Sequence, residues 1–500
     1  MEESYQLQKP CDVHGSFTDS VRGIGMDPLR LRAIDHTAAS VGLPPRALME
    51  AAGVGLASAI AAEVAPGSRV MLLIGRGNNG GDALAAVRYL DQYELVIHTI
   101  GSPSAITDGP TRENLEVLRM VQTPIEPVYA ADSLALEDLD LVVDAMVGTG
   151  LRGPLREPVA SIVERLNGST VPVLAVDVPS GFRGAAAADS HVRADRIVTF
   201  HAPTPGLDSV GADVTTVPIG ISTELAQLAG PGDLLGIRRS STAHKGVGGR
   251  VLIIGGGPYT GAPALAAQAA LAAGADLAYV LAPRAVAESI DQMSPDLIVR
   301  AVDGERFGPE HVAAAVSLTE EMSAVVIGPG LGASAETERF VGSVLRELTG
   351  VVIVDADALG AVPAVESPAE LICTPHQGEF ELMGAESASD WRTRRTEVIA
   401  RAAEWGVTLL VKGAIDLVSD GTVSRYNTSG NPAMTVGGTG DVLAGVTGAF
   451  AATMDPVTAA AAACYLNGHA GDRAAETYGA GLTATRLIDA IAPTLAEVGP

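Results

Sequence analysis

The 500-residue sequence is poor in cysteine, with only Cys11, Cys373 and Cys464. Their spacing does not match a metal-binding motif, and three thiols cannot build a disulfide framework, so a reducing compartment such as the cytoplasm is expected. The sequence also lacks the basic and apolar regions of a secretory signal at its start. The apolar run at 442–454 is shorter than the roughly 20 residues that cross a bilayer. These absences predict a protein without a membrane span.

Basic residues are scarce as well. The sequence has 33 lysines and arginines and 59 aspartates and glutamates, which gives a net charge of -26. Such a charge disfavours nucleic acids and anionic membranes as partners and favours small molecules. Lysine is limited to Lys9, Lys245 and Lys412. Since nearly every other cation is arginine, Lys245 and Lys412 are candidates for chemistry that needs a compact ammonium. The acidity fits either a salt-rich cytoplasm, where ions screen self-repulsion, or a genome that favours arginine codons.

The length and the 47% apolar content predict two or three domains, because single cores stop growing near roughly 250 to 300 residues. Residues 1–25 show no period and are predicted to be a disordered leader. Short apolar runs that alternate with helical segments then predict parallel sheets with crossover helices. These runs cover 70–74, 95–100, 141–145, 173–178, 196–200, 250–254, 324–327, 351–355 and 408–412. A hairpin turn is expected at 419–421, and helices are expected from 441 to the end.

The segment 219–249 interrupts this alternation with glycine, proline and serine, as a linker would. The sequence therefore predicts two α/β domains, 26–236 and 237–500. The first is expected to be a Rossmann-like parallel-sheet domain.

A glycine turn precedes one of the predicted helices, in the sequence Gly437-Gly438-Thr439-Gly440-Asp441. Its backbone amides and the start of the helix can hold an anion such as a phosphate. A carboxylate at this position suits the removal of a proton from a hydroxyl group that takes part in phosphoryl transfer. The simpler alternative is that Asp441 only caps the helix.

Polar groups also follow two predicted strands of the second domain, at Lys412-Gly413 and in the segment 374–380, which contains His376. Ligands of α/β sheets bind at such strand ends. Together with the glycine turn, Gly328-Pro329-Gly330-Leu331-Gly332 and Asp355-Ala356-Asp357, these segments resemble the ADP/ATP-dependent NAD(P)H-hydrate dehydratases, which have a ribokinase-like fold. The further segments that carry the resemblance are His244-Lys245-Gly246, 255–261 and Gly430-Asn431-Pro432.

This resemblance implies site residues in the second domain. Asp441 would be the catalytic base and would also contact the hydrated substrate, together with Ala262, Gly330 and His376. The nucleotide would be bound by Lys412, Gly413, Ala414, Ile415, Asp416, Asn431, Gly438, Thr439 and Gly440.

In the first domain, Gly75-Arg76-Gly77-Asn78-Asn79-Gly80 matches the dinucleotide-binding pattern G-x-G-x-x-G between a strand and a helix. The adjacent amide side chains of Asn78 and Asn79 and the nearby carboxylate of Asp82 are more polar side chains than a turn that binds pyrophosphate needs. Amide and carboxylate oxygens suit a cation or hydrogen bonds to a ligand.

Two other strand ends add acids, at Asp144 and at Asp177, which precedes Ser180. With 148–154 and the Asn78–Asp82 loop, they resemble the NAD(P)H-hydrate epimerases, with Thr204 where that family usually has lysine. The resemblance implies that Asp177 is catalytic and contacts the substrate. Potassium would be bound by Asn79, Asp144 and Ser180. The remaining substrate contacts would be Asn78, Asn79, Gly80, Gly81, Asp82, Gly148, Thr149, Gly150, Leu151, Arg152, Gly153 and Pro154.

Joined, the two halves resemble the bifunctional NAD(P)H-hydrate repair enzymes. This resemblance implies that the first domain epimerises the R and S hydrates of NADH and NADPH. The second domain would then dehydrate the S form with ADP or ATP. The cofactors implied are K⁺ in the first domain and Mg²⁺ with ADP in the second, and a cytoplasmic homo-oligomer is expected. Two alternatives stay open: a ribokinase-like kinase of a small alcohol fused to a nucleotide-binding Rossmann module, and a non-catalytic first domain that senses nucleotides or serves as a scaffold.

Overall fold

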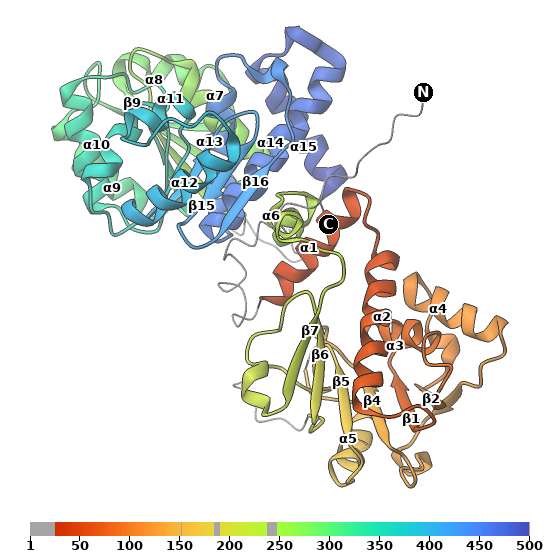
Figure 1. Cartoon of the computed structure of the whole chain (residues 1–500). Coiled ribbons are helices and arrows are strands. Elements are labelled where there is room, and N and C mark those ends of the chain that lie inside the picture. The colour runs from red at the N-terminus through yellow and green to blue at the C-terminus, as the bar shows by residue number, and fades with distance from the viewer. Residues whose placement is uncertain (1–25, 152, 185–190, 238–247, 500) are drawn as a thin grey trace, which may run out of the picture. The chain divides into compact units, whose positions relative to one another are not determined.

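The computed structural model describes residues 26–151, 153–184, 191–237 and 248–499. The predictions made for the leader 1–25, for Arg152 and for His244-Lys245-Gly246 fall outside these ranges. The chain forms two compact units (Figure 1). One holds Leu43–Ile221 and the residues up to Leu31, and the other holds Arg32–Gly42 and Ser222–Pro500.

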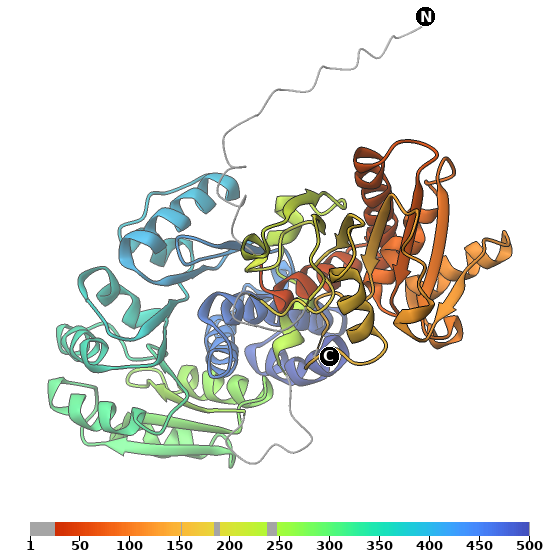
Figure 2. The same cartoon turned by 90° about the horizontal axis from the view of Figure 1, so that it is seen from below.

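The first unit is built on a seven-stranded sheet that is parallel throughout its described part (Figure 2). Its order is β3-β2-β1-β4-β5-β6-β7, so the strand order reverses between β1 and β4. The strands are β1 (Arg69–Ile74), β2 (Glu94–Ile100), β3 (Glu126–Val128), β4 (Leu141–Ala145), β5 (Val173–Val176), β6 (Arg196–Phe200) and β7 (Asp213–Val217). The helices are α2 (Pro45–Glu63), α3 (Asn78–Val87), α4 (Gly109–Met120) and α5 (Val159–Asn167).

Both faces of this sheet are buried, which explains why its strands are continuous apolar runs. Along β1, Leu72 belongs to the core that includes Leu56 of α2, whereas Met71 belongs to the core that includes Ile162 of α5. Successive side chains of a strand point to opposite faces, so one strand supplies both cores. The predicted α/β class is therefore confirmed for this unit. The short β3 and the exposed β7 were not predicted as strands.

The second unit contains a nine-stranded sheet in the order β10-β9-β8-β11-β12-β13-β14-β15-β16. The β14–β15 and β15–β16 pairs are antiparallel and the others are parallel, so the predicted hairpin is confirmed. The strands are β8 (Arg250–Ile254), β9 (Leu277–Pro283), β10 (Leu297–Val302), β11 (Ala324–Ile327), β12 (Val351–Val354), β13 (Glu370–Cys373), β14 (Thr408–Val411), β15 (Asp416–Ser419) and β16 (Ser424–Asn427).

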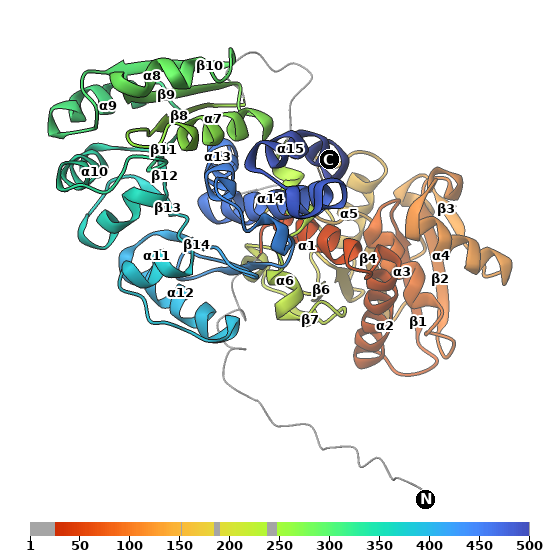
Figure 3. The ribbon, with the colours of Figure 1, turned by 90° about the horizontal axis from the view of Figure 1, so that it is seen from above.

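Helices cover both faces of this sheet, with α7, α13, α14 and α15 on one side and α9 to α12 on the other (Figure 3). They are α6 (Thr223–Gln227), α7 (Gly261–Ala272), α8 (Arg284–Asp291), α9 (Val312–Thr319), α10 (Ala335–Glu347), α11 (Gln377–Leu382), α12 (Trp391–Trp405), α13 (Thr439–Ala451), α14 (Pro456–Tyr478) and α15 (Ala484–Val498). The helices predicted after residue 441 are thus confirmed. None of the helices in the described ranges has the length and apolar character of a membrane span.

The glycine of α13 at Gly445 allows an unusually close approach to α7. A methyl group at this position would lie 2.0 Å from the carbonyl oxygen of Ala266. The position of α13, which carries Asp441 in its first turn, is therefore fixed by direct contact with a neighbouring helix.

From Ser222 on, the described part of the predicted linker belongs to the second unit. Gly232 N–H donates to Thr37 Oγ1 of α1 (Pro28–Ser40) at 3.3 Å, and a methyl group at Gly232 would overlap the carbonyl of Ala33. Arg425 of β16 donates to Asp233 at 2.6 Å, and the two side chains are 3% and 1% exposed. The compact units thus divide near 221 and 222, whereas the predicted domain boundary was at 236 and 237.

Breaking this buried ion pair should destabilise the second unit. Arg425→Met removes the positive charge that neutralises the buried Asp233 carboxylate, which costs roughly 3–5 kcal/mol. Both tryptophans of the chain, Trp391 and Trp405, lie in α12, so urea unfolding followed by their fluorescence reports on this unit alone. The double variant Asp233→Leu/Arg425→Met should recover part of the loss. A double variant as unstable as the sum of the single variants would contradict the assignment.

Candidate active sites

The polar side chains of the second unit gather where its parallel strands end. Asp355 follows β12, the segment Thr374–His376 follows β13, and Lys412 follows β14. Because these strands are neighbours and run in the same direction, their carboxyl ends meet at one edge of the sheet, where α/β proteins bind ligands.

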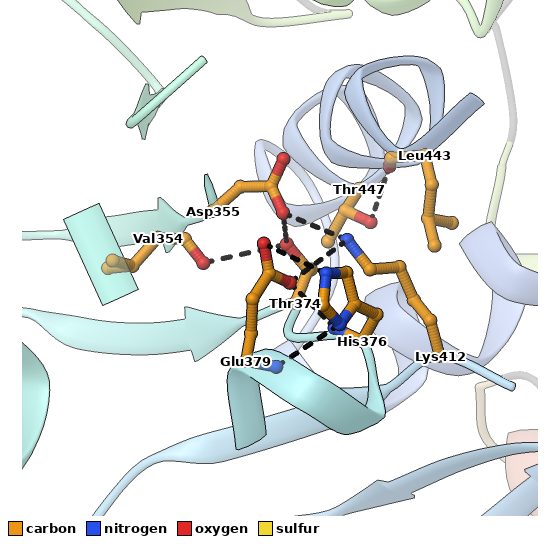
Figure 4. A network of polar contacts seen from close by, with 8 residues as sticks. All are labelled: Val354, Asp355, Thr374, His376, Glu379, Lys412, Leu443 and Thr447. Carbon is orange, nitrogen blue, oxygen red and sulfur yellow. Dashed lines mark hydrogen bonds and ion pairs between the residues drawn. The ribbon is translucent and has the colours of Figure 1, made fainter. Parts of the chain in front are cut away.

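Lys412 is the centre of a charged network at this edge (Figure 4). Its Nζ donates to Asp355 Oδ1 at 3.1 Å and lies 4.0 Å from Glu379 Oε2. Thr374 Oγ1 donates to the same Asp355 oxygen at 2.7 Å. His376 caps α11, since Glu379 N–H donates to its Nδ1 at 3.1 Å and its own N–H donates to Glu379 Oε2 at 2.8 Å.

The predicted glycine turn lies next to the Lys412 ammonium. A methyl group at Gly440 would be 3.2 Å from Nζ. Gly438 has a φ of 94°, in the left-handed region that favours glycine, and its carbonyl accepts from Val442 N–H as α13 begins. The amide groups of the first helical turn therefore point outward, beside an ammonium group, and form a place for an anion.

Asp441, in the same turn, has a strongly shifted acidity. Burial and the negative charge of Asp355 raise its pKa to about 7, and the charge of Lys412 opposes the shift. The Lys412 pKa is also raised, because Asp355 and Glu379 outweigh the opposing effect of burial. Asp441 is thus poised to exchange a proton near neutral pH.

The segment predicted to hold the nucleotide, 412–416, is a turn that is stabilised by the side chain of Asp416. Gly413 N–H donates to Asp416 Oδ1 at 3.0 Å, and Asn427 donates to the other oxygen of Asp416 at 2.9 Å. Arg394 of α12 donates to the carbonyl of Ile415 at 2.7 Å, and its guanidinium faces Gly413. The carboxylate of Asp416 is therefore occupied in holding the turn.

Asn431 lies beside a cavity of about 660 Å³, which is lined by Pro432, Ala433, Asp472, Ala475, Glu476, Gly479 and Ala480 as well. Its side chain donates to Asp472 Oδ1 at 2.9 Å and accepts from Ala433 N–H at 3.0 Å. These bonds fix the loop that forms one wall of the cavity.

Ala262 and Gly330, predicted to contact the substrate, are adjacent in the structure. A methyl group at Gly330 would lie 3.4 Å from the Ala262 Cβ and 2.6 Å from the carbonyl oxygen of Tyr259. His376 has a 60% exposed side chain and pairs with Lys412 along the edge of the sheet. Small residues thus line one part of this edge, and charged residues line another.

The first unit brings Asp144 and Ser180 into direct contact. Ser180 Oγ donates to Asp144 Oδ1 at 2.6 Å, and Ser180 N–H donates to Oδ2 at 2.8 Å. Asp144 is fully buried, and burial raises its pKa. The carbonyl of Val147 lies 3.3 Å from Ser180 Oγ and adds another oxygen to the group.

Asn79 carries an unusual side chain, since both atoms of its buried amide lack a hydrogen-bond partner among the described residues. It lies against Gly148, where a methyl group would be 3.3 Å from the Asn79 Cγ. Buried polar atoms are rarely left unpaired, so this amide suits a ligand or ion. The segment Asn78–Asp82, predicted as a loop, is instead the first turn of α3. Gly80 is required in it because a methyl group would lie 2.2 Å from the carbonyl oxygen of Gly75.

Asp177 occupies a strained backbone position directly after β5. Its φ of 65° is costly for a residue with a side chain, and such strain gathers at functional sites. Burial raises its pKa to about 6, against a weak 3.4 Å bond from Thr199 Oγ1. The segment 148–154, which was predicted to contact the substrate, follows β4, the neighbouring strand.

Sequence reasoning did not assign roles to Asp355, Thr374, Glu379 or Arg394, although the structure places them in the second site. Asp355 and Thr374 follow apolar runs immediately, a signal that could have marked them. Glu379 and Arg394 lie within helices, and only the fold brings them to the site.

Comparisons with known proteins match both units. Residues 251–493 match the family model described as NAD(P)H-hydrate dehydratase, and residues 45–206 match the YjeF-related protein N-terminus. The bifunctional NAD(P)H-hydrate repair enzyme Nnr of Pyrobaculum aerophilum is 39% identical over 92% of this chain and 96% of its own. Its counterpart in Archaeoglobus fulgidus is also 39% identical, with the same coverage.

The chain belongs to the family of bifunctional NAD(P)H-hydrate repair enzymes.

Two solved structures are among those similar to this member of the repair-enzyme family. The ADP/ATP-dependent NAD(P)H-hydrate dehydratase of Bacillus subtilis, co-crystallised with ATP and Mg²⁺, is 27% identical and covers 52% of this chain and 94% of its own, with a TM-score of 0.47. A ribokinase-like superfamily protein of Enterococcus faecalis is 26% identical over 53% and 94%, also with a TM-score of 0.47.

The raised pKa of Asp441 predicts that Asp441→Asn stabilises the protein as the pH rises. The folded state keeps the Asp441 proton up to about pH 7, whereas the unfolded chain releases it near the ordinary pKa of 3.8. The folded state therefore loses stability over this window, and the asparagine variant lacks that loss. The melting temperature of the variant should exceed that of the parent by a margin that grows between about pH 4 and 7. An equal margin at both pH values would show that Asp441 has an ordinary pKa.

Proposed function

We propose that this chain repairs hydrated NADH and NADPH in two steps, epimerisation of the R and S hydrates in the first unit and nucleotide-dependent dehydration of the S hydrate in the second. The observation that carries the proposal is Asp441, with its pKa of about 7, in the first turn of a helix that begins beside the Lys412 ammonium. An anion site and a base are both needed to phosphorylate a hydroxyl group.

In the second unit, the hydroxyl on C6 of the nicotinamide ring is a poor leaving group until it is phosphorylated. Asp441 takes the proton of this hydroxyl while the hydroxyl oxygen forms a bond to the terminal phosphorus of the nucleotide. The bond between that phosphorus and the rest of the nucleotide breaks. The C6–O bond then breaks with departure of phosphate, and a proton leaves C5 to restore the ring double bond. Lys412 and the amides at 438–440 stabilise the transferring phosphoryl group.

The nucleotide is proposed to lie along the turn 412–416, with its base toward the cavity beside Asn431. Mg²⁺ supplies charge neutralisation to the phosphates when it is bound with the nucleotide. Among the described residues, no group of three or more histidines, cysteines or acids could hold a metal. In this proposal the nucleotide phosphates supply much of the Mg²⁺ coordination, as is usual for this ion.

In the first unit, Asp177 is the proposed acid or base for epimerisation at C6. K⁺ would be held by the oxygens of Asn79, Asp144 and Ser180, a set that fits because the buried Asn79 amide has no hydrogen-bond partner among the residues that the structure describes. The ion would supply a fixed positive charge beside segment 148–154, which is proposed to hold the substrate with the first turn of α3. The same proposal includes assembly of the protein into a homo-oligomer and its location in the cytoplasm.

A small-alcohol kinase fused to a nucleotide-binding module would use the same glycine turn. One assay separates the two. Purified R and S hydrates are supplied separately with ADP or ATP, and the absorbance of reduced nicotinamide is followed. Recovery from both hydrates supports the proposed function, and no recovery with either nucleotide would overturn it.

Asp441→Asn should keep the fold and nucleotide binding but lower dehydration by about 10² or more, the scale expected when a general base is lost. The rate for the parent should fall as the pH drops below about 7, because the base is then protonated. Epimerisation by the variant is the internal control and should be unchanged. Turnover near the parental rate would rule out Asp441 as the base.

Asp177→Asn should leave the S hydrate repairable, while the R hydrate is consumed only as fast as it epimerises spontaneously. The epimerisation rate of the parent should change around pH 6, where Asp177 titrates, with a fall at lower pH if Asp177 acts as the base and a rise if it acts as the acid. Stopped assays that resolve the two hydrates by chromatography would measure this. Equal consumption of both hydrates by the variant would show that Asp177 is only structural.

A further inference from the structure

The buried carboxylate of Asp355 lies in the second site but takes no direct part in the proposed proton and phosphoryl transfers. It is 2% exposed and accepts two hydrogen bonds at the same oxygen, from Thr374 Oγ1 at 2.7 Å and from Lys412 Nζ at 3.1 Å (Figure 4). Burying a carboxylate is costly unless it is paired, so the position of this group must be closely specified by its neighbours.

The backbone of Asp355 is held as firmly as its side chain. Its N–H donates to the carbonyl of Ile327 at 3.0 Å. Its own carbonyl lies against Gly328, where a methyl group would be only 1.7 Å away. The carboxylate is thus presented by the rigid end of β12 rather than by a mobile loop.

The other partner, Lys412, is a long side chain with several rotatable bonds. Its backbone N–H donates to the carbonyl of Pro375 at 2.8 Å, which fixes its start, and the ion pair with Asp355 fixes its end. The ammonium held in this way lies beside Gly440, whose absent side chain leaves room for it. The next carboxylate oxygen, of Glu379, is 4.0 Å away and offers a weaker alternative.

We propose that Asp355 is a positioning residue of the dehydratase reaction, which holds the Lys412 ammonium against the glycine turn beside Asp441. The inference rests on the proposed function of this site. Asp355 need not touch the substrate, because it acts through Lys412 and through its own charge.

The charges that face Asp441 predict the direction of the effect. Asp355, Asp357 and Glu379 raise its pKa, and Lys412 lowers it. Replacing Asp355 with asparagine removes one negative charge and keeps a carbonyl that can accept from Thr374. The pKa of Asp441 should then fall, and the acid limb of the rate profile should move from about 7 to lower pH.

The test compares Asp355→Asn with the parent over pH 5 to 9 in kcat and in KM for the nucleotide and the hydrate, with about a tenfold or larger fall in kcat/KM expected. Glu381→Gln is the matched control, because it removes one carboxylate from the surface of α11, where Glu381 bonds to Gln377. It should leave the rate profile in place. An unmoved acid limb in Asp355→Asn, or an equal shift in both variants, would overturn the proposal.

A second measurement does not depend on activity. Because the chain has only three lysines, competitive acetylation followed by mass spectrometry can report on Lys412, with Lys9 and Lys245 as internal references. Labelling of Lys412 relative to these references should rise severalfold in Asp355→Asn. Thr374→Val, which removes one bond to Asp355 but no charge, should give a smaller rise and serves if the first variant does not fold. Unchanged labelling in both would contradict the positioning role.

These outcomes differ from a failure of the proposed function. If the parent recovers no reduced nicotinamide from either hydrate, the reaction is wrong. If the parent is active and the variants match it in pH profile and labelling, only the role of Asp355 is wrong.

Discussion

Two-sided burial of parallel strands is the constraint on which the rest of each unit depends. Strands such as β1 and β12 are apolar on both faces and need helices above and below. Polar chemistry is therefore excluded from the body of each sheet and collects at its carboxyl edge. Asp144 and Asp177 in the first unit, and Asp355 and Lys412 in the second, all occupy this place.

Close backbone contacts at glycine make these edges rigid. A methyl group at Gly75 would lie 1.8 Å from the carbonyl oxygen of Met146, and one at Gly328 would lie 1.7 Å from that of Asp355. The loops that carry the acids thus rest directly on neighbouring backbone. Rigid support matters because a base such as Asp441 and an ammonium such as Lys412 act only when they are held in place before the reaction.

The sequence alone predicted most of the central strands, because runs such as 70–74 and 250–254 are continuously apolar. It did not predict the exposed edge strand β7 or the edge strand β10, which is only partly buried. The association of 222–236 with the second unit depends on the contact between Asp233 and Arg425, which are far apart in sequence. In the sites, Asp441 at the start of α13 and strand-end residues such as Asp177 were foreseeable from the residue pattern and the family resemblance, whereas contacts between helices and the site needed the fold. The roles of the site residues stay predictions.

The most direct measurement of the central claim is the stoichiometry of the second unit's reaction. Pure S hydrate would be mixed with the full chain and ADP or ATP, and reduced nicotinamide, inorganic phosphate and the shortened nucleotide would be quantified together. The account predicts one phosphate and one shortened nucleotide for each ring restored, and no restoration without nucleotide. Restoration without nucleotide consumption, or nucleotide consumption without restoration, would contradict it.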